Sequence, residues 1–327
     1  MRSLSGASLA SAALLALGAF ALVTTTTGCA KFNEVKAMRS YKEANKTYQA
    51  QDYKKAAQLY ADTLAAAPDD DRVTPAYFFL ANSLDNQWKP SKKGDPENDK
   101  LLDQAVANYQ KAAERLSKSD NPDYKKLGKL SLQYLVAAYG TDKLNDPAKA
   151  EPVLINMIQQ DPSDTTLYTQ LAKLYEDAGA YDQAEKVLLI AKNQHPDSGV
   201  YMTLAAFYNR EGQFDKTMEA LKERADKEPN NPEAFYTMAT FYWDEAYRDF
   251  KLKDNQKRDY VQKGMEAIDH ALQIKPDYID ALVYKGLLLR LKATLEPNHD
   301  TAMEEVKEAE KLSQQANDLR KKKAAGQ

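Results

Sequence analysis

The chain has 327 residues, of which 43% are hydrophobic and 28% charged, so it is long enough to bury a sizeable core. Its 12 glycines and scarcity of β-branched runs argue against an extensive sheet. The formal net charge of −3 supplies no basic field, and we therefore expect no nucleic-acid partner. The composition is typical of an alanine-rich helical protein.

The first 28 residues have the pattern of an export signal. Arg2 precedes an apolar stretch over residues 9–23, which at about 15 residues is short of the ~20 that a membrane span needs. Small residues then lead to Cys29, the only cysteine in the chain. Thr27, Gly28 and Cys29 resemble the end of a bacterial lipoprotein signal. The resemblance implies that residues 1–28 are removed and that Cys29 carries lipid.

An ordinary cleavage after Ala30, with Gly28 and Ala30 as the small residues, is the alternative to lipidation. Thr26 stands where the lipoprotein pattern usually has leucine. Both interpretations send the protein out of the cytoplasm, and we favour lipidation because the lone cysteine stands at this place. By analogy with enteric bacteria, Ala30 after the cysteine favours the outer over the inner membrane. Residues 29–35 would form a short tether.

Paired helices are predicted for the next part of the chain. The first pair covers residues 36–67 and ends at Pro68, and the second begins near Thr74. Residues 89–100, rich in Pro, Gly, Lys and Asp, are interpreted as an inserted surface loop. Helix resumes with Ala105, Tyr109 and Ala112, and a third pair ends at Pro162.

One pattern is written twice over residues 165–229. Each copy has spacings of three and four that place its apolar residues on one stripe of a helix. Gly179 and Gly212 mark a turn in the middle of each copy, and Pro196 and Pro229 mark its end. The first copy contains Tyr168, Leu171, Ala172, Tyr175, Tyr181, Ala184 and Leu188, and each counterpart follows 33 residues later: Tyr201, Leu204, Ala205, Tyr208, Phe214, Thr217 and Leu221.

These residues resemble the tetratricopeptide repeat. The family pattern has an aromatic, then Leu-Gly/Ala, then Tyr on its first helix, and a small residue, a large apolar residue and Pro on its second. The resemblance implies an all-α fold over residues 36–327, a right-handed α-solenoid of about seven antiparallel helix pairs. One pair cannot bury its own apolar face, so neighbouring pairs must stack.

The last two pairs depart from the 33-residue spacing. The sixth begins at Pro232 and carries about 12 extra residues, which we place as an insertion near 245–257. The seventh ends with a charged helix near 300–321, whose thin apolar stripe suits a capping helix that is wet on its outer side.

No catalytic or metal-binding pattern is found in the sequence. His195, His270 and His299 lie near predicted helix ends, and no two of them have the spacing of a metal site. We therefore predict no catalytic residue, no metal, no cofactor and no enzymatic activity. An enzyme assembled from scattered residues is the remote alternative.

The resemblance implies a concave groove lined by the first helix of each pair. Exposed aromatics beside amides and an arginine are typical of binding surfaces. For Trp243 and Tyr247, the alternative is packing beneath the insertion of pair six. The predicted partner-binding residues are Tyr236, Thr240, Trp243, Met202, Asn209, Arg210 and Lys173, and equivalent positions are Glu176, Tyr41, Asn45, Tyr48, Phe78, Asn82 and Asp85.

The leading hypothesis is a membrane-tethered periplasmic scaffold that holds a peptide or partner protein in this groove. Envelope assembly, secretion or pilus biogenesis are settings suggested by analogy alone. Two alternatives remain open: a spacer or oligomer component acting through its ends and convex face, and a soluble periplasmic adaptor without lipid. The sequence predicts neither the partner's identity nor the oligomeric state.

Overall fold

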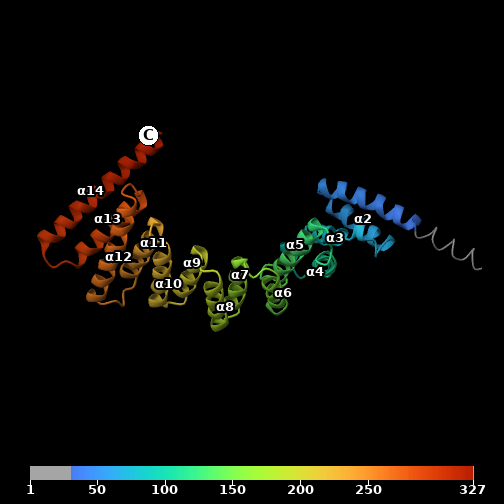
Figure 1. Ribbon diagram of the computed structural model, residues 1–327, viewed down its shortest axis with the longest axis horizontal. Helices are drawn as coiled ribbons and strands as arrows, with labels where there is room; N and C mark the ends of the chain where they lie inside the picture. Colours follow the sequence, from blue (N-terminus) through green and yellow to red (C-terminus); the bar gives the residue numbers. More distant parts are fainter. Residues whose placement is uncertain (1–30, 327) are drawn as a thin grey trace, which may run out of the picture. The chain divides into compact units, whose positions relative to one another are not determined.

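The computed structural model describes residues 31–326, which form two compact units that divide between residues 162 and 163. Figure 1 shows the helices of both units in chain order. The predicted signal peptide and Cys29 lie outside the described residues. None of the helices among residues 31–326 is both long and apolar enough to span a bilayer.

Unit 1 contains three antiparallel helix pairs. Tyr60 and Tyr109 are fully buried within it, and Leu102, Leu116 and Leu154 complete much of its core. Two short 3-10 turns precede α3 and α4, at Asp71–Val73 and Pro90–Lys92. The helices are the N-terminal helix over residues 31–49, α2 (Tyr53–Ala66), α3 (Ala76–Asp85), α4 (Pro96–Leu116), α5 (Pro122–Tyr139) and α6 (Pro147–Gln160).

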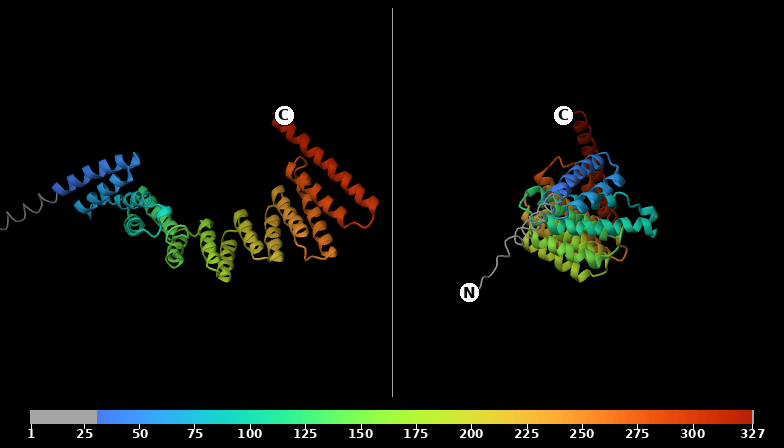
Figure 2. Two further views of the ribbon diagram at one scale, coloured as in Figure 1. Left: turned by 180° about the vertical axis from the view of Figure 1, so that it is seen from behind. Right: turned by 90° about the vertical axis from the view of Figure 1, so that its right-hand side faces the viewer.

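Unit 2 contains four further pairs, and its first helices contact one another as well as their own partners. Contacts join α7 to α9 and α11 to α13 directly. The left view in Figure 2 shows the helices of the unit following one another in chain order. The helices are α7 (Thr165–Asp177), α8 (Tyr181–Gln194), α9 (Ser198–Arg210), α10 (Phe214–Lys227), α11 (Pro232–Arg248), α12 (Asp254–Ile274), α13 (Ile279–Leu295) and α14 (His299–Ala324).

Side-chain caps fix where many of these helices begin. An Asp or Asn oxygen accepts a hydrogen bond from a backbone N–H of the first turn, which would otherwise lack a partner. Proline follows directly in α4, α5, α6 and α11, where its missing N–H costs nothing. The capping residues are Asp52, Asp95, Asn121, Asp146, Asp164, Asp197, Asn231 and Asn298.

The turns inside the two copies of the repeat depend on glycine. Gly179 and Gly212 have φ angles of 73° and 68°, a left-handed conformation that other residues adopt only with strain. Close helix contacts use small residues instead: Ala205 and Ala239 are fully buried. The predicted all-α fold of about seven antiparallel helix pairs is confirmed, with three pairs in unit 1 and four in unit 2.

Three segments differ in detail from the prediction. Residues 31–35, predicted as part of a tether, are helical, although all five are exposed. Within the predicted loop 89–100, helix α4 already begins at Pro96, because Asp95 caps it and Pro96 suits a first turn. In pair six the loop between the helices is only residues 249–253, so most of the extra length extends α11 and α12 themselves.

Candidate functional site

Five aromatic side chains of unit 2 form one continuous surface, which we call the aromatic surface: Tyr236, Trp243 and Tyr247 from α11, Tyr278 at the start of α13, and Tyr284 within α13. The Trp243 and Tyr247 rings stack at 5.0 Å with 9° between their planes. Tyr284 joins the two ends, because its ring centroid lies 5.4 Å from that of Tyr236 and 5.7 Å from that of Trp243. Both contacts are edge-on, a favoured geometry for aromatic pairs.

The aromatic surface is anchored at one end and exposed at the other. Tyr236 and Trp243 are half-buried against the core of pairs six and seven, whereas Tyr247 is 62% exposed. Burial, together with the nearby Tyr284 and Asp280, raises the pKa of Tyr236 to about 12, so its hydroxyl stays protonated and can donate a hydrogen bond. The surface therefore offers aromatic faces and neutral hydroxyl groups.

Helix geometry explains why these residues gather. Tyr236, Trp243 and Tyr247 are spaced by seven and four, which places them on one side of α11. That side faces α13, the first helix of the next pair, so Tyr284 meets it. Beyond Tyr278 lies a hollow of about 720 Å³ whose lining includes Lys275, Asp280, Arg320 and Lys323.

The other predicted groove residues of unit 2 make contacts within the unit. Arg210 donates two hydrogen bonds to the carboxylate of Glu176, at 2.6 and 2.9 Å, and so ties α9 to α7. Lys173 pairs with Asp177 one turn away. Both cations therefore have carboxylate partners. The sequence could not show this, because the two carboxylates lie at α7 positions that have no fixed role in the repeat.

The remaining three predicted residues differ in exposure. Met202 is half-buried, and its sulfur accepts a hydrogen bond from Nη1 of buried Arg224 at 3.1 Å. The Thr240 hydroxyl donates to the Thr237 carbonyl at 2.7 Å, so it is turned toward its own helix. Asn209 is exposed at the end of α9.

In unit 1 the predicted groove positions fill the interior instead. Phe78, Asn82 and Asp85 are at most 9% exposed. Tyr48 donates to the Asn82 side-chain oxygen at 2.7 Å, and the Asn82 amide donates to the Tyr109 hydroxyl at 3.2 Å. The expectation of an open groove in pair two is therefore wrong, because α4 and the N-terminal helix cover these positions.

Tyr41 and Asn45 lie beside an open hollow at the edge of unit 1. The Asn45 oxygen accepts a hydrogen bond from Tyr60 at 2.8 Å, so this side chain also supports the core. The hollow has a volume of about 500 Å³. Its lining residues are Glu34, Val35, Met38, Arg39, Tyr41, Lys42, Asn45 and Arg72.

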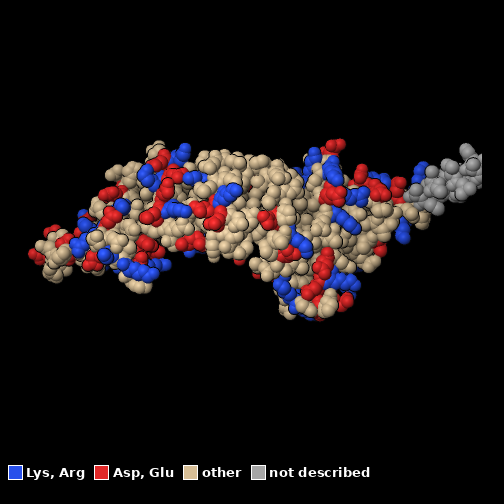
Figure 3. Space-filling model, turned by 90° about the horizontal axis from the view of Figure 1, so that it is seen from below, with Lys and Arg blue, Asp and Glu red and all other residues tan. Residues whose placement is uncertain are grey.

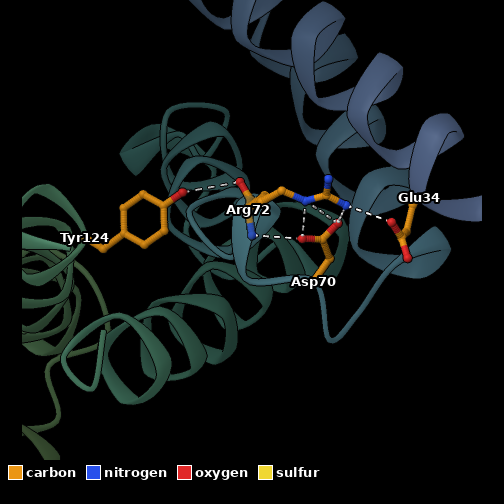
Figure 4. Close-up of polar contacts among 4 residues, drawn as sticks. All are labelled: Glu34, Asp70, Arg72 and Tyr124. Carbon is orange, nitrogen blue, oxygen red and sulfur yellow. Dashed lines mark hydrogen bonds and ion pairs between the residues drawn. The ribbon is translucent and has the colours of Figure 1, made fainter. Parts of the chain in front are cut away.

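Arg72 fastens the N-terminal helix to the rest of unit 1 (Figure 4). Its guanidinium contacts Asp70 and reaches Glu34 of the helix at 3.0 Å. Its carbonyl oxygen accepts a hydrogen bond from Tyr124 of α5 at 3.4 Å. The hydrogen bond from Arg72 lowers the pKa of Asp70, so the contact between Arg72 and Asp70 persists into mild acid.

Where charged side chains gather on the face drawn in Figure 3, acidic and basic groups are interspersed. Residues 31–326 contain no group of three or more His, Cys, Asp or Glu arranged to hold a metal ion. The arrangement fits the recognition of another macromolecule by aromatic stacking and hydrogen bonding.

Sequence reasoning missed Tyr278 and Tyr284. The 33-residue spacing ends at pair six, whose longer helices shift every later position, so no repeat position pointed to α13. The available signal was the density of tyrosine at the start of the seventh pair, at residues 278 and 284.

Comparison with known proteins supports the repeat assignment. A family model described as tetratricopeptide repeat matches residues 143–207, which contain α6, α7, α8 and most of α9. Among curated proteins, none matches this sequence.

Several solved structures are similar to the chain at low identity. The C-terminal part of a TPR repeat-containing protein from Cytophaga hutchinsonii is 15% identical, covering 85% of this chain and 98% of its own, with a TM-score of 0.47. A crystal structure of MamA protein is 19% identical, covering 60% and 94%, with a TM-score of 0.40. MamA from Desulfovibrio magneticus RS-1 is 16% identical, covering 57% and 95%, with a TM-score of 0.36. All three scores are below 0.5, so the functional argument rests on the family match and on the residues themselves.

Proposed function

This chain is a tetratricopeptide-repeat protein, and we propose that it is a membrane-tethered scaffold that binds a partner protein or peptide on the aromatic surface of unit 2. The observation that carries the proposal is the stacking of exposed Tyr247 on half-buried Trp243, against which Tyr284 packs edge-on. The repeat core does not require these rings, because Ala239 and Ile268 already fill the interior of pair six. We propose no catalytic role.

The surface favours an extended peptide segment as the bound element. The rings lie along α11 and α13 as a strip, with Tyr247 exposed at one end and Tyr278 beside the hollow at the other. Rigid aromatic side chains contribute large contact areas at low entropic cost, which is why they dominate binding energy in many interfaces.

The location proposed for this scaffold is the periplasmic side of the bacterial envelope. The export-signal pattern and Cys29 support a lipid anchor there, and Ala30 supports the outer membrane. The setting, whether envelope assembly, secretion or pilus biogenesis, is an analogy with other repeat scaffolds.

A spacer or oligomer component is the second candidate. Lys173, Glu176 and Arg210, which the sequence placed in the groove, are held in ion pairs within unit 2. The Arg210–Glu176 pair joins α9 to α7, whereas Lys173 pairs with Asp177 of its own helix. This observation favours a structural role for pairs four and five, and such a role is compatible with partner binding by pair six.

One experiment tests anchor and partner together: affinity capture from solubilised envelope, with mass spectrometry of the mature N-terminus. We expect the mature chain to begin at a lipid-modified Cys29 and to retain one partner. Tyr247→Ala is the sharpest variant, because this ring is exposed and its loss leaves the core intact. It should reduce the binding free energy by about 2 kcal/mol, which lowers the affinity for the partner roughly thirtyfold.

Tyr181→Ala is the matched control, since Tyr181 is also exposed but lies on α8, outside the aromatic surface. The double variant Tyr236→Ala, Trp243→Ala should abolish capture, and its helix content and unfolding midpoint must be measured beside it because both rings are half-buried. If the Tyr247→Ala variant and a folded Tyr236→Ala, Trp243→Ala variant both capture the partner as well as the parent chain does, the aromatic surface is not the binding site. An unmodified N-terminus starting after Ala30 would refute the anchor alone.

A further inference from the structure

The outer face of the N-terminal helix combines exposed apolar side chains with unpaired cations. Phe32, Val35 and Met38 are 71%, 53% and 37% exposed. They are three of the nine large hydrophobic residues found exposed among the described residues, within seven positions of one another. Exposed apolar side chains that lie this close together indicate an interaction site.

The opposite side of the same helix is fixed to the core. Ala37 and Ala44 are fully buried and Thr47 is nearly so. At 100° per residue, the side opposite Ala37 and Ala44 carries a stripe with spacings of four, three, four and four. The stripe consists of Lys31, Val35, Met38, Lys42 and Lys46, with Phe32 and Arg39 beside it.

The charge of this face is strongly positive. Residues 31–49 contain five Lys or Arg and two Glu, against a net charge of −3 for the whole chain. Glu34 shares the guanidinium of Arg72 with Asp70, and Glu43 is exposed, so five cations against two glutamates leave residues 31–49 with a net charge of +3. Within the described part of the chain, Lys31, Arg39, Lys42 and Lys46 have no ion pair.

We propose that this face of the N-terminal helix lies on an anionic lipid bilayer, with Phe32, Val35 and Met38 in the headgroup region and the four cations over anionic headgroups. An apolar strip flanked by Lys and Arg is the composition of helices that bind at membrane interfaces. Lys31 follows Cys29 by two residues, so a lipid at Cys29 would bring this helix to the membrane; this orientation rests on the anchor proposed above. The hollow beside Val35 and Met38 continues the apolar surface.

The helix would act as a second signal beside the anchor. A basic patch close to an anionic surface contributes its own attraction, so this contact would add to the attachment that the anchor supplies. Because Arg72 joins the helix to Asp70 and to the loop before α3, the contact would also orient unit 1 on the membrane.

Vesicle co-sedimentation tests the proposal with the unlipidated chain from Ala30 onward, which holds every described residue. The probes are vesicles of phosphatidylcholine with and without phosphatidylglycerol. We expect binding to the anionic vesicles only, and its loss at high salt. The charge variant changes Lys31, Arg39, Lys42 and Lys46 to Gln, and it should bind at least tenfold more weakly, since each cation near an anionic surface contributes about fivefold.

Two control variants distinguish binding by this face from binding that any cluster of cations, or any set of exposed apolar side chains, would give. Changing Arg320, Lys321, Lys322 and Lys323 to Gln removes four cations from the end of α14 and should leave binding within about twofold. Phe32→Ser, Val35→Ser, Met38→Ser should also bind at least about tenfold more weakly. Tyr181→Ser, Ile190→Ser, Met303→Ser changes three other exposed residues and should bind as the parent chain does.

Each contrary outcome overturns the proposal. Equal loss in the α14 variant would mean that any cluster of cations suffices. Full binding by the apolar variant would show that charge alone attaches the helix, and that Phe32, Val35 and Met38 do not enter the headgroup region. If the chain bound neither the neutral nor the anionic vesicles, the proposed contact with a bilayer would be excluded. None of these outcomes bears on lipidation of Cys29 or on partner capture, because the chain tested carries no lipid and no partner.

Discussion

Asp85 and Lys143 show how single side chains hold the three pairs of unit 1 together. Asp85 is almost fully buried, accepts a hydrogen bond from Tyr109 at 3.4 Å and pairs with Lys143 at 2.5 Å. Burial and the nearby Asp85 raise the pKa of Tyr109, so its hydroxyl remains a donor. Through Asn82 and Tyr48 the network reaches the N-terminal helix.

Removing Lys143 should therefore be costly. Lys143→Ala leaves the Asp85 carboxylate buried without its cation, and we expect the free energy of unfolding to fall by about 3 kcal/mol. Urea unfolding followed by circular dichroism measures the change. Lys149→Ala is the control: its pair with Asp146 is exposed to solvent, so its removal should leave the free energy of unfolding close to that of the parent chain.

A second substitution identifies the cause. Asp85→Asn in the Lys143→Ala background should return part of the lost stability, because a neutral amide is less costly to bury than an unpaired carboxylate. Equal effects of Lys143→Ala and Lys149→Ala, or no recovery when Asp85→Asn is added, would show that the ion pair is incidental to the fold.

Individual residues also show where sequence reasoning ends. The repeat predicted the buried positions Leu171, Ala205 and Leu221 because helical spacing and close approach dictate them. It placed Phe78 and Asn82 on an open face, whereas α4 and the N-terminal helix cover them. Which neighbour covers a position depends on the length of the preceding loop, and the repeat pattern carries no information about it.

At the scale of helices, two carboxylates join pair four to pair five. Glu176 of α7 binds Arg210 of α9. Glu185 of α8 accepts hydrogen bonds from Tyr208 at 2.7 Å and from Lys216 at 2.9 Å. Both pKa values are lowered, Glu176 chiefly by its hydrogen bond from Arg210 and Glu185 chiefly by that from Lys216.

These contacts should make stability depend on pH in acid. A carboxyl whose folded-state pKa is lowered stabilises the fold above its unfolded pKa of about 4.3, and this stability is lost as the pH falls through the folded-state value. The variant Glu176→Gln, Glu185→Gln should be less stable than the parent chain by about 1 kcal/mol at neutral pH. The difference should shrink as the pH falls through the lowered folded-state pKa values of the two carboxyl groups, in urea midpoints measured as a function of pH.

Glu304→Gln, Glu310→Gln is the charge-matched control. Both residues are exposed on α14 and have no ion pair within residues 31–326. A difference between the Glu176, Glu185 variant and the parent chain that stays constant from neutral pH to pH 3 would contradict the assignment. So would an equal effect of the α14 control at neutral pH.

At the scale of the whole molecule, the sequence was sufficient for the number and order of helix pairs. Caps such as Asp164 and Asp197 and turn glycines such as Gly179 are local signals, so they can be read without knowing the neighbours. The aromatic surface was predictable only in part. Tyr236 and Trp243 follow from the repeat, but Tyr284 meets them only because α13 packs against α11, a contact set by the extended sixth pair.

A stack of this kind depends on how its last face is closed. Leu282 and Leu289 of α13 are buried, and α14 covers them with Ala309, Leu312 and Ala316. The outward side of α14 is densely charged. In a linear array each pair contacts only its neighbours, so a terminal helix with a wet outer side is what keeps the exposed end soluble.

Deleting residues 299–327 should therefore uncover the apolar side of α13. We expect self-association in size-exclusion chromatography, and loss of amide-exchange protection in α13 and then α12, while α7 and α8 keep theirs. Deleting only residues 322–327 is the control, because it leaves Leu312 and Ala316 in place. A monomeric truncated chain with unchanged protection of α13 would mean that α14 is an appendage. Loss of protection throughout unit 2 would mean that its four pairs unfold as one block, contrary to coupling through nearest neighbours.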